Sequence, residues 1–265
     1  MSDIRLGVIA GKMQRVTGLG NISPLWKGPL LLDTRVTSPN CWVKAVTLPE
    51  LVLECFGHLA ARAAGLPFLE PIVALDPKGQ LGGAPSQHYF GTADASPYSL
   101  RQLINLYPPF SSHYISALEA WAKGATLAVL DELLANGDRN LGNLLFDGNK
   151  TWIPIDYSRC KAAGPAPAPA WDGIPIATDC IKPNHLIEIL PLLNATNAAQ
   201  AIADVEQADI DPGVSANFSG LPVSGSEQVA RTMVNWTIDR RKNYLRQLLG
   251  KKLSVQRNPT QVNTP

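Results

Sequence analysis

The chain has 265 residues, of which 45% are hydrophobic and 17% are charged. That length and hydrophobic content are sufficient for one large core or for two lobes. The formal net charge of +1 argues against a broad basic surface, so we expect no direct binding of nucleic acid or of a membrane.

Glycine-rich turns precede the first clear strand. Gly18-Leu19-Gly20-Asn21 and Trp26-Lys27-Gly28-Pro29 are the two candidates, and neither has Gly-x-Gly-x-x-Gly spacing. Backbone N–H groups at such glycines, with Ser23 beside them, can approach phosphate oxygens. An ordinary surface turn explains these residues equally well.

A strand and a capped helix are predicted next. Cys41–Val46 has the composition of a strand, and Thr47-Leu48-Pro49-Glu50 has the form of a capping box with proline in the first turn. The helix that it opens should end at Gly65-Leu66-Pro67, and the apolar segment 71–75 predicts another strand.

Lys44 inside this strand and an acid on the helix suggest an ion pair. In kinases, a strand lysine and a glutamate on the following helix position the α- and β-phosphates of ATP. Glu50 and Glu54 are both candidates for the acid. We favour Glu54, because a capping-box glutamate folds back onto the helix N-terminus. Taken singly, each residue is explained more simply as a solvated charge.

From about residue 93 the hydrophobic periodicity is mostly helical. Apolar residues between Ile115 and Leu134 recur at helical intervals and predict one long buried helix.

The next segment contains two acids and an asparagine at a distinctive spacing. Asp138 and Asn143 have the Asp-x-x-x-x-Asn spacing of a kinase catalytic loop, and Asp156 ends a predicted hairpin of Leu144–Phe146 and Trp152–Ile155. In such a site one carboxylate accepts a hydroxyl proton, while an amide oxygen and a second carboxylate hold magnesium. A polar loop and hairpin without catalysis is the alternative, and the combination of features favours the site.

Segment 137–157 resembles the catalytic segment of the HipA-like kinases, which are similar in turn to the phosphatidylinositol kinases. The resemblance implies an α+β, bilobed, protein-kinase-like fold that uses ATP and Mg²⁺. Residues 1–92 would form a small β-rich N-lobe with one main helix, and residues 93–250 would form a larger helical C-lobe. Residues 251–265 have the composition of a disordered tail.

The same resemblance implies roles for individual residues. Asp138 matches the catalytic base, and Asn143 and Asp156 match the metal ligands. Lys44 and Glu54 complete the catalytic set, and the nucleotide-binding candidates are Lys44, Gly18, Gly20 and Ser23. Asp156-Tyr157-Ser158 lacks the Phe-Gly that makes this segment mobile in protein kinases, which argues against an activation switch of that kind.

Several other features do not indicate a binding function. The proline-rich segment 164–170 predicts an extended surface loop. A final helix is predicted to begin near residue 224 and to stop at Gly250, with an apolar face that suits the core. The four cysteines and four histidines have no metal-ligand spacing, so we expect free thiols and no zinc. The sequence shows no signal peptide pattern and no membrane span, which favours the cytoplasm.

The expected function is ATP-dependent transfer of the γ-phosphate to a serine or threonine of a protein, with autophosphorylation included. The family resemblance implies a protein substrate or an antitoxin-like partner within a toxin–antitoxin system. One alternative is a kinase-shaped module that binds a nucleotide or a partner without phosphate transfer. A lipid kinase is disfavoured by the small size and by the lack of a basic membrane-facing cluster.

Overall fold

In the computed structural model, five strands close into a barrel in the order β1-β5-β6-β4-β3, because β3 pairs with both β4 and β1. β1 and β5 are parallel, and the other barrel pairs are antiparallel. The barrel strands are β1 (Arg5–Ile9), β3 (Leu25–Leu32), β4 (Thr37–Lys44), β5 (Pro71–Asp76) and β6 (Gln87–Ala93). The short strand β2 (Gln14–Val16) adds to the edge of β3.

The structure describes residues 3–17, 23–34, 36–94, 98–148, 151–160, 192–194, 196–210, 217–235, 237, 245–246 and 249–250. The predictions for Gly18, Gly20, segment 164–170 and the tail 251–265 lie outside these residues. Among the described helices, none is long and apolar enough to cross a membrane.

The alternation of side chains along the strands separates two cores. Cys41 and Val43 of β4 are completely buried inside the barrel, together with Ile72 of β5. Side chains of a strand alternate between its faces, so Lys44 lies on the outer face of the barrel wall. Val73, next to Ile72, belongs to the second core, which lies outside the barrel.

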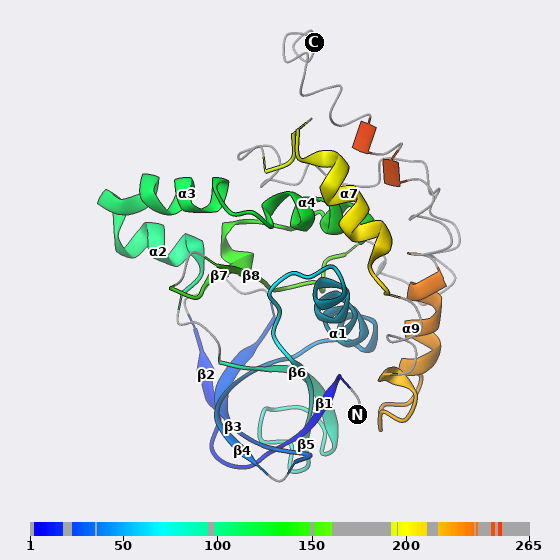
Figure 1. Cartoon of the computed structure of the whole chain (residues 1–265). Coiled ribbons are helices and arrows are strands. Elements are labelled where there is room, and N and C mark those ends of the chain that lie inside the picture. The colour runs from blue at the N-terminus through cyan, green and yellow to red at the C-terminus, as the bar shows by residue number, and fades with distance from the viewer. Residues whose placement is uncertain are drawn as a thin grey trace, which may run out of the picture.

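Helix α1 (Leu48–Ala63) covers this outer face. Its N-terminus is closed by the predicted capping box, in which Thr47 and Glu50 satisfy each other's backbone N–H groups. It ends before Gly65, whose φ of +68° suits a helix terminus. Figure 1 shows α1 between the barrel and helices α4 and α7.

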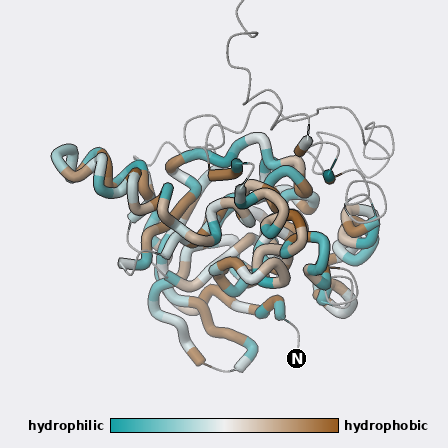
Figure 2. Tube along the Cα trace, turned by 45° about the horizontal axis from the view of Figure 1, so that its top comes forward, coloured by the Kyte–Doolittle hydropathy of each residue, from teal (hydrophilic) through white to brown (hydrophobic). Residues whose placement is uncertain are grey.

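Five further α-helices and two short 3-10 turns are assigned among the described residues outside the barrel. They are α2 (Leu100–Leu106), η1 (Pro108–Phe110), α3 (Ser111–Glu119), α4 (Gly124–Leu133), η2 (Leu141–Asn143), α7 (Ala198–Gln207) and α9 (Ser226–Asn235). Helix α4 is buried along its whole length and packs against α1 and α7, and α9 packs against α1. Figure 2 shows hydrophobic residues concentrated in these central segments, whereas the arm formed by α2 and α3 extends away from them.

Two local predictions were wrong. The single long helix over 115–134 is two helices, α3 and α4, because the chain turns at Trp121 and restarts at Gly124, a poor helix former. The segment at Gly28 is part of β3 and not a turn.

The α+β class is confirmed, and so are the hairpin of β7 (Leu144–Phe146) and β8 (Trp152–Pro154) and the strand β5.

Candidate active site

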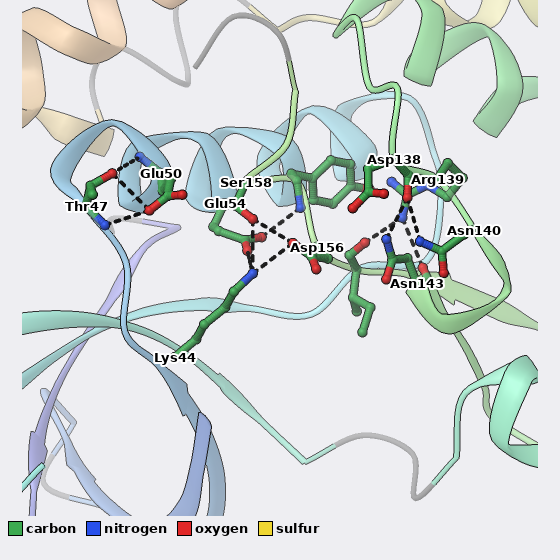
Figure 3. A network of polar contacts seen from close by, with 12 residues as sticks. Lys44, Thr47, Glu50, Glu54, Asp138, Arg139, Asn140, Asn143, Asp156 and Ser158 are labelled. Atoms are coloured by element: carbon green, nitrogen blue, oxygen red, sulfur yellow. Dashed lines mark hydrogen bonds and ion pairs between the residues drawn. The ribbon is translucent and has the colours of Figure 1, made fainter. Parts of the chain in front are cut away.

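Lys44, the last residue of β4, is the centre of a polar network. Its Nζ donates hydrogen bonds to Oε1 of Glu54 (2.9 Å), Oδ1 of Asp156 (2.8 Å) and Oγ of Ser158 (3.0 Å). An ammonium group has three N–H donors, so all three are used. Figure 3 shows these side chains meeting beside α1. The structure therefore brings three of the predicted site residues, Lys44, Glu54 and Asp156, into one cluster from three separate segments.

Charge stabilises this arrangement. Burial by itself would lower the pKa of Lys44, but the carboxylates of Glu54 and Asp156 outweigh burial and raise that pKa well above its ordinary value. For Asp156, burial by itself would raise the pKa. The Lys44 ammonium and the hydrogen bonds from Lys44 and Ser158 outweigh burial and hold the pKa of Asp156 below its ordinary value. Lys44 is therefore a cation and Asp156 an anion at neutral pH.

Glu54, and not Glu50, is the partner of Lys44. Glu54 is 1% exposed on α1, and its second oxygen, Oε2, accepts a hydrogen bond from the backbone N–H of Tyr157 (2.8 Å). Glu50 is engaged at the cap, where its Oε2 accepts hydrogen bonds from the N–H (2.8 Å) and the hydroxyl (2.9 Å) of Thr47. Glu54 thus connects the strand lysine to the backbone next to Asp156.

Asp156 has an unusual backbone conformation. Its φ is +61°, in the left-handed region that aspartate tolerates better than most residues. Oδ1 accepts two hydrogen bonds, from Lys44 and from Ser158, whereas Oδ2 accepts none from the residues that the structure describes. Such outliers are retained where surrounding contacts determine the conformation, which is common at functional sites.

The loop that carries Asp138 is built around a buried arginine. Arg139 is 0% exposed, and its Nε and Nη2 bind both carboxylate oxygens of Asp131 on α4, at 2.9 Å and 3.0 Å. Its Nη1 donates to the backbone carbonyls of Asn143 (3.0 Å) and Ile155. A planar, bidentate donor of this kind fixes direction as well as distance. Arg139 therefore joins the loop to the strand end that precedes Asp156.

Asn143 is 8% exposed and oriented by the same loop. Its Nδ2 donates to the carbonyl of Asp138 (2.8 Å), so Oδ1 points away from that carbonyl, and no hydrogen bond to Oδ1 occurs within the described chain. The backbone N–H of Ile155 donates to the carbonyl of Asn143 (3.0 Å). Asn143 and Asp156 are consequently neighbours across this junction, each with one side-chain oxygen that accepts no hydrogen bond from the described residues.

Asp138 has an exposed side chain, whose carboxylate makes no hydrogen bond or ion pair with any residue of the described ranges. Its backbone is fixed from both sides: its N–H donates to Oδ1 of Asn136 (3.1 Å), and its carbonyl accepts from the Nδ2 of Asn140 (2.8 Å). Asn140 also accepts from the N–H of Gly142 (2.8 Å). The loop thus presents the exposed carboxylate of Asp138 on a hydrogen-bonded backbone, next to Asn143 (Figure 3).

Tyr157 joins α1 to the segment of Asp156. It is 0% exposed, and its ring lies so close to α1 that a Cβ at Gly57 would be 2.1 Å from its Cγ. The ring packs edge-on against His58, with 5.2 Å between ring centroids, and lies under the guanidinium of Arg139 at 4.9 Å. The absence of a side chain at residue 57 is therefore a condition for this arrangement.

The donors available for a metal are few. No cluster of three His, Cys, Asp or Glu side chains that could hold a metal ion occurs among the described residues. Oδ1 of Asn143 and Oδ2 of Asp156 are oxygen donors of the kind that Mg²⁺ prefers, and Mg²⁺ usually keeps water or phosphate oxygens for its remaining positions. The donor set therefore fits magnesium and does not fit a structural zinc site.

Of the three predicted residues of the phosphate loop, only Ser23 is described, and it is half-buried just ahead of β3. The loop that contains it joins β2 to β3. Leu25 of β3 pairs with Val16 on one side and with Lys44 on the other, so this loop leaves the barrel at the end where Lys44 lies.

Sequence reasoning missed three residues of the site: Ser158, Arg139 and Asp131. Arg139 was visible only as the middle residue of Asp-Arg-Asn, and its buried pair with Asp131 has no local sequence signal. Ser158 was noted only as the residue that replaces a glycine.

The chain was compared with known protein families, protein sequences and solved structures. No protein-family profile and no curated protein sequence matches the chain. Among solved structures, the crystal structure of a proinflammatory kinase of Helicobacter pylori, CtkA, is similar with a TM-score of 0.55 and 15% sequence identity. The similarity covers 91% of this chain and 99% of that one. At this identity the similarity concerns the fold alone, and the chain has a kinase-like fold.

Proposed function

We propose that this chain is an ATP-dependent kinase that transfers the γ-phosphate to a serine or threonine hydroxyl of a protein, autophosphorylation included. The main support is the convergence of Lys44, Glu54 and Asp156 within hydrogen-bond distance, in a chain with a kinase-like fold. A half-buried strand lysine paired with a glutamate of the following helix is the arrangement by which kinases position phosphates.

Each residue has a role in this proposal. Lys44 binds the α- and β-phosphates, and Glu54 holds Lys44. Asn143 and Asp156 hold Mg²⁺, which neutralises charge on the phosphates when it is bound. Asp138 receives the proton of the acceptor hydroxyl. The oxygen of that hydroxyl then bonds to the γ-phosphorus, and the bond between this phosphorus and the ADP oxygen breaks. The free, exposed carboxylate of Asp138 suits a base that must reach a second substrate.

The wider predictions belong to the same proposal. Residues 1–92 would be the N-lobe and residues 93–250 the C-lobe of a bilobed, HipA-like enzyme, with Gly18, Gly20 and Ser23 covering the phosphates. Ser23 lies just ahead of β3, whose first residue, Leu25, pairs with Lys44, and this position supports that assignment. A cytoplasmic protein substrate or an antitoxin-like partner would supply the acceptor.

The test is phosphate transfer from γ-labelled ATP by the purified full chain, alone and with a cell lysate. We expect Asp138→Asn to reduce the rate by roughly 10²–10⁴-fold, the range for loss of a general base. The matched control is Asp209→Asn, because Asp209 is an exposed aspartate after α7 that lies outside the site. Equal rates for wild type and Asp138→Asn, or an inactive wild type with bound nucleotide, would refute the proposed function.

One observation favours a second candidate, a kinase-shaped module that binds nucleotide without transfer. All three N–H donors of Lys44 are already bound by protein acceptors, so a phosphate must displace one of them. Magnesium-dependent binding of ATP without labelled product, alone or with lysate, would establish this module instead of the kinase.

A further inference from the structure

Ser158 is the one member of the Lys44 network that the kinase pattern does not assign. It lies two residues after Asp156 and is 6% exposed. Its Oγ donates to Oδ1 of Asp156 at 2.7 Å and accepts from Nζ of Lys44 at 3.0 Å. A serine hydroxyl has a single hydrogen, so both directions are fixed: the proton points at the carboxylate, and a lone pair faces the ammonium.

This position has a geometric consequence for Asp156. With Lys44 and Ser158 both bound to Oδ1, rotation of the carboxylate would break two charge-assisted hydrogen bonds. Oδ2 is the oxygen left without a hydrogen bond in the described chain. A carboxylate that binds a cation through one oxygen depends on neighbours that hold the other, and such partners orient metal ligands in proteins generally.

Ser158 also contributes to the backbone at this point. Left-handed φ is unfavourable at a residue other than glycine, and Asp156 adopts it at +61°. The contact from Ser158 to Asp156 spans this turn, and the Tyr157 N–H bound to Glu54 holds its middle. Glycine, which stands at this place in the protein-kinase pattern, can make neither side-chain contact.

We infer that Ser158 is a positioning residue of the phosphate and cation site. Its hydroxyl holds Oδ1 of Asp156 so that Oδ2 is available to Mg²⁺, and it keeps Lys44 beside that carboxylate. The inference rests on the proposed nucleotide site. Its statement about cation binding does not require that phosphate be transferred.

The test compares Ser158→Ala and Ser158→Thr with wild type. Binding of Mn²⁺, as a paramagnetic substitute for Mg²⁺, is measured by electron paramagnetic resonance in the presence of a non-hydrolysable ATP analogue. ATP turnover is measured in parallel as Mg²⁺ is titrated. We expect Ser158→Ala to weaken Mn²⁺ binding by about 10–100-fold, the range for partners of metal ligands, and to raise the Mg²⁺ requirement of turnover more than it lowers kcat. Ser158→Thr, which keeps the hydroxyl, should restore both.

Ser226→Ala is the matched control. Ser226 is 2% exposed, and its hydroxyl makes no hydrogen bond in the described chain, so this variant removes a buried hydroxyl that is not part of the network. Wild-type Mn²⁺ affinity and Mg²⁺ requirement in Ser158→Ala, or an equal loss in Ser226→Ala, would overturn the inference. If wild type binds Mn²⁺ and nucleotide without phosphate transfer, the proposed kinase function is refuted. The role of Ser158 is then tested by the Mn²⁺ affinities of the variants alone. A wild type that binds neither would end both proposals.

Discussion

A buried histidine should make this protein sensitive to mild acid. His58 on α1 is 0% exposed, and neither ring nitrogen has a hydrogen-bond partner among the residues that the structure describes. Its ring stacks on Phe90 with 5.7 Å between centroids and meets the edge of Tyr157 at 5.2 Å. The pKa of His58 is lowered from 6.5 to about 3, chiefly by burial and also by the charge of Arg139, whereas the charge of Asp156 opposes the shift.

The sign and size of the effect follow from proton linkage. A folded-state pKa below the unfolded value means that the unfolded chain binds a proton which the folded chain does not bind. The contribution to stability is therefore complete above pH 6.5 and is lost as the pH falls from 6.5 toward 3. Each pH unit in that interval is worth about 1.4 kcal/mol, so the free energy of unfolding should fall by about 2 kcal/mol between pH 7 and pH 5 from His58 alone.

The assay is urea denaturation at pH 7 and pH 5, with wild type and His58→Leu compared at each pH. Leucine is apolar and of similar volume, so it should remove the acid-sensitive part, about 2 kcal/mol between the two pH values. His113→Gln is the control, because His113 is exposed on α3 and should leave the pH dependence unchanged. The reasoning would be refuted if wild type and His58→Leu lost the same stability between pH 7 and pH 5.

Three further substitutions test the packing around the site. Gly57→Ala should lower the free energy of unfolding by about 1–2 kcal/mol, since overpacking against Tyr157 outweighs the helix propensity gained, and urea denaturation will measure it. Arg139→Met leaves the buried carboxylate of Asp131 uncompensated and should cost about 3–5 kcal/mol, also measured in urea. Thr47→Ala removes the cap of α1 and should lower the melting temperature by roughly 2–4 °C, which corresponds to about 1 kcal/mol.

Each of these has a clear contrary result. Gly124→Ala is the control for the first, because the nearest atom to the added Cβ would be the terminal Cδ2 of Leu192, at 3.1 Å; equal effects of the two alanines would exclude the Tyr157 contact as the cause. A stable Arg139→Met would show that the pair with Asp131 is replaceable. An unchanged melting temperature of Thr47→Ala would show that the cap of α1 contributes nothing.

The parts of the site that the sequence predicted correctly are those encoded by short stretches of chain. Thr47 and Glu50 satisfy each other across three residues, so their capping box is visible locally. The hairpin of β7 and β8 is likewise marked by two apolar triplets and a turn. The choice of Glu54 over Glu50 followed from the capping box itself, because an acid engaged at the cap cannot reach Lys44.

The parts that could not be predicted depend on contacts between distant segments. Closure of the barrel requires β1 to pair with β3 as well as with β5, and hydrophobic alternation does not encode such a pairing. β6 was hidden because its Phe90 faces α1 while Tyr89 faces the barrel, so each side chain has a different core. The turn between α3 and α4 interrupts a helical periodicity that continues through it.

The contacts that orient the site residues in this chain are also contacts that stabilise the fold. Lys44 is oriented by Glu54, Glu54 by the backbone N–H of Tyr157, and Tyr157 by the space that Gly57 leaves on α1. Each of these contacts joins segments that also pack in the second core. The segment of Asp156 is therefore held by the protein itself, through the packed ring of Tyr157, the hydrogen bond of its backbone N–H to Glu54, and the hydroxyl of Ser158. A site assembled in this way needs no separate event to bring its lysine and carboxylates together.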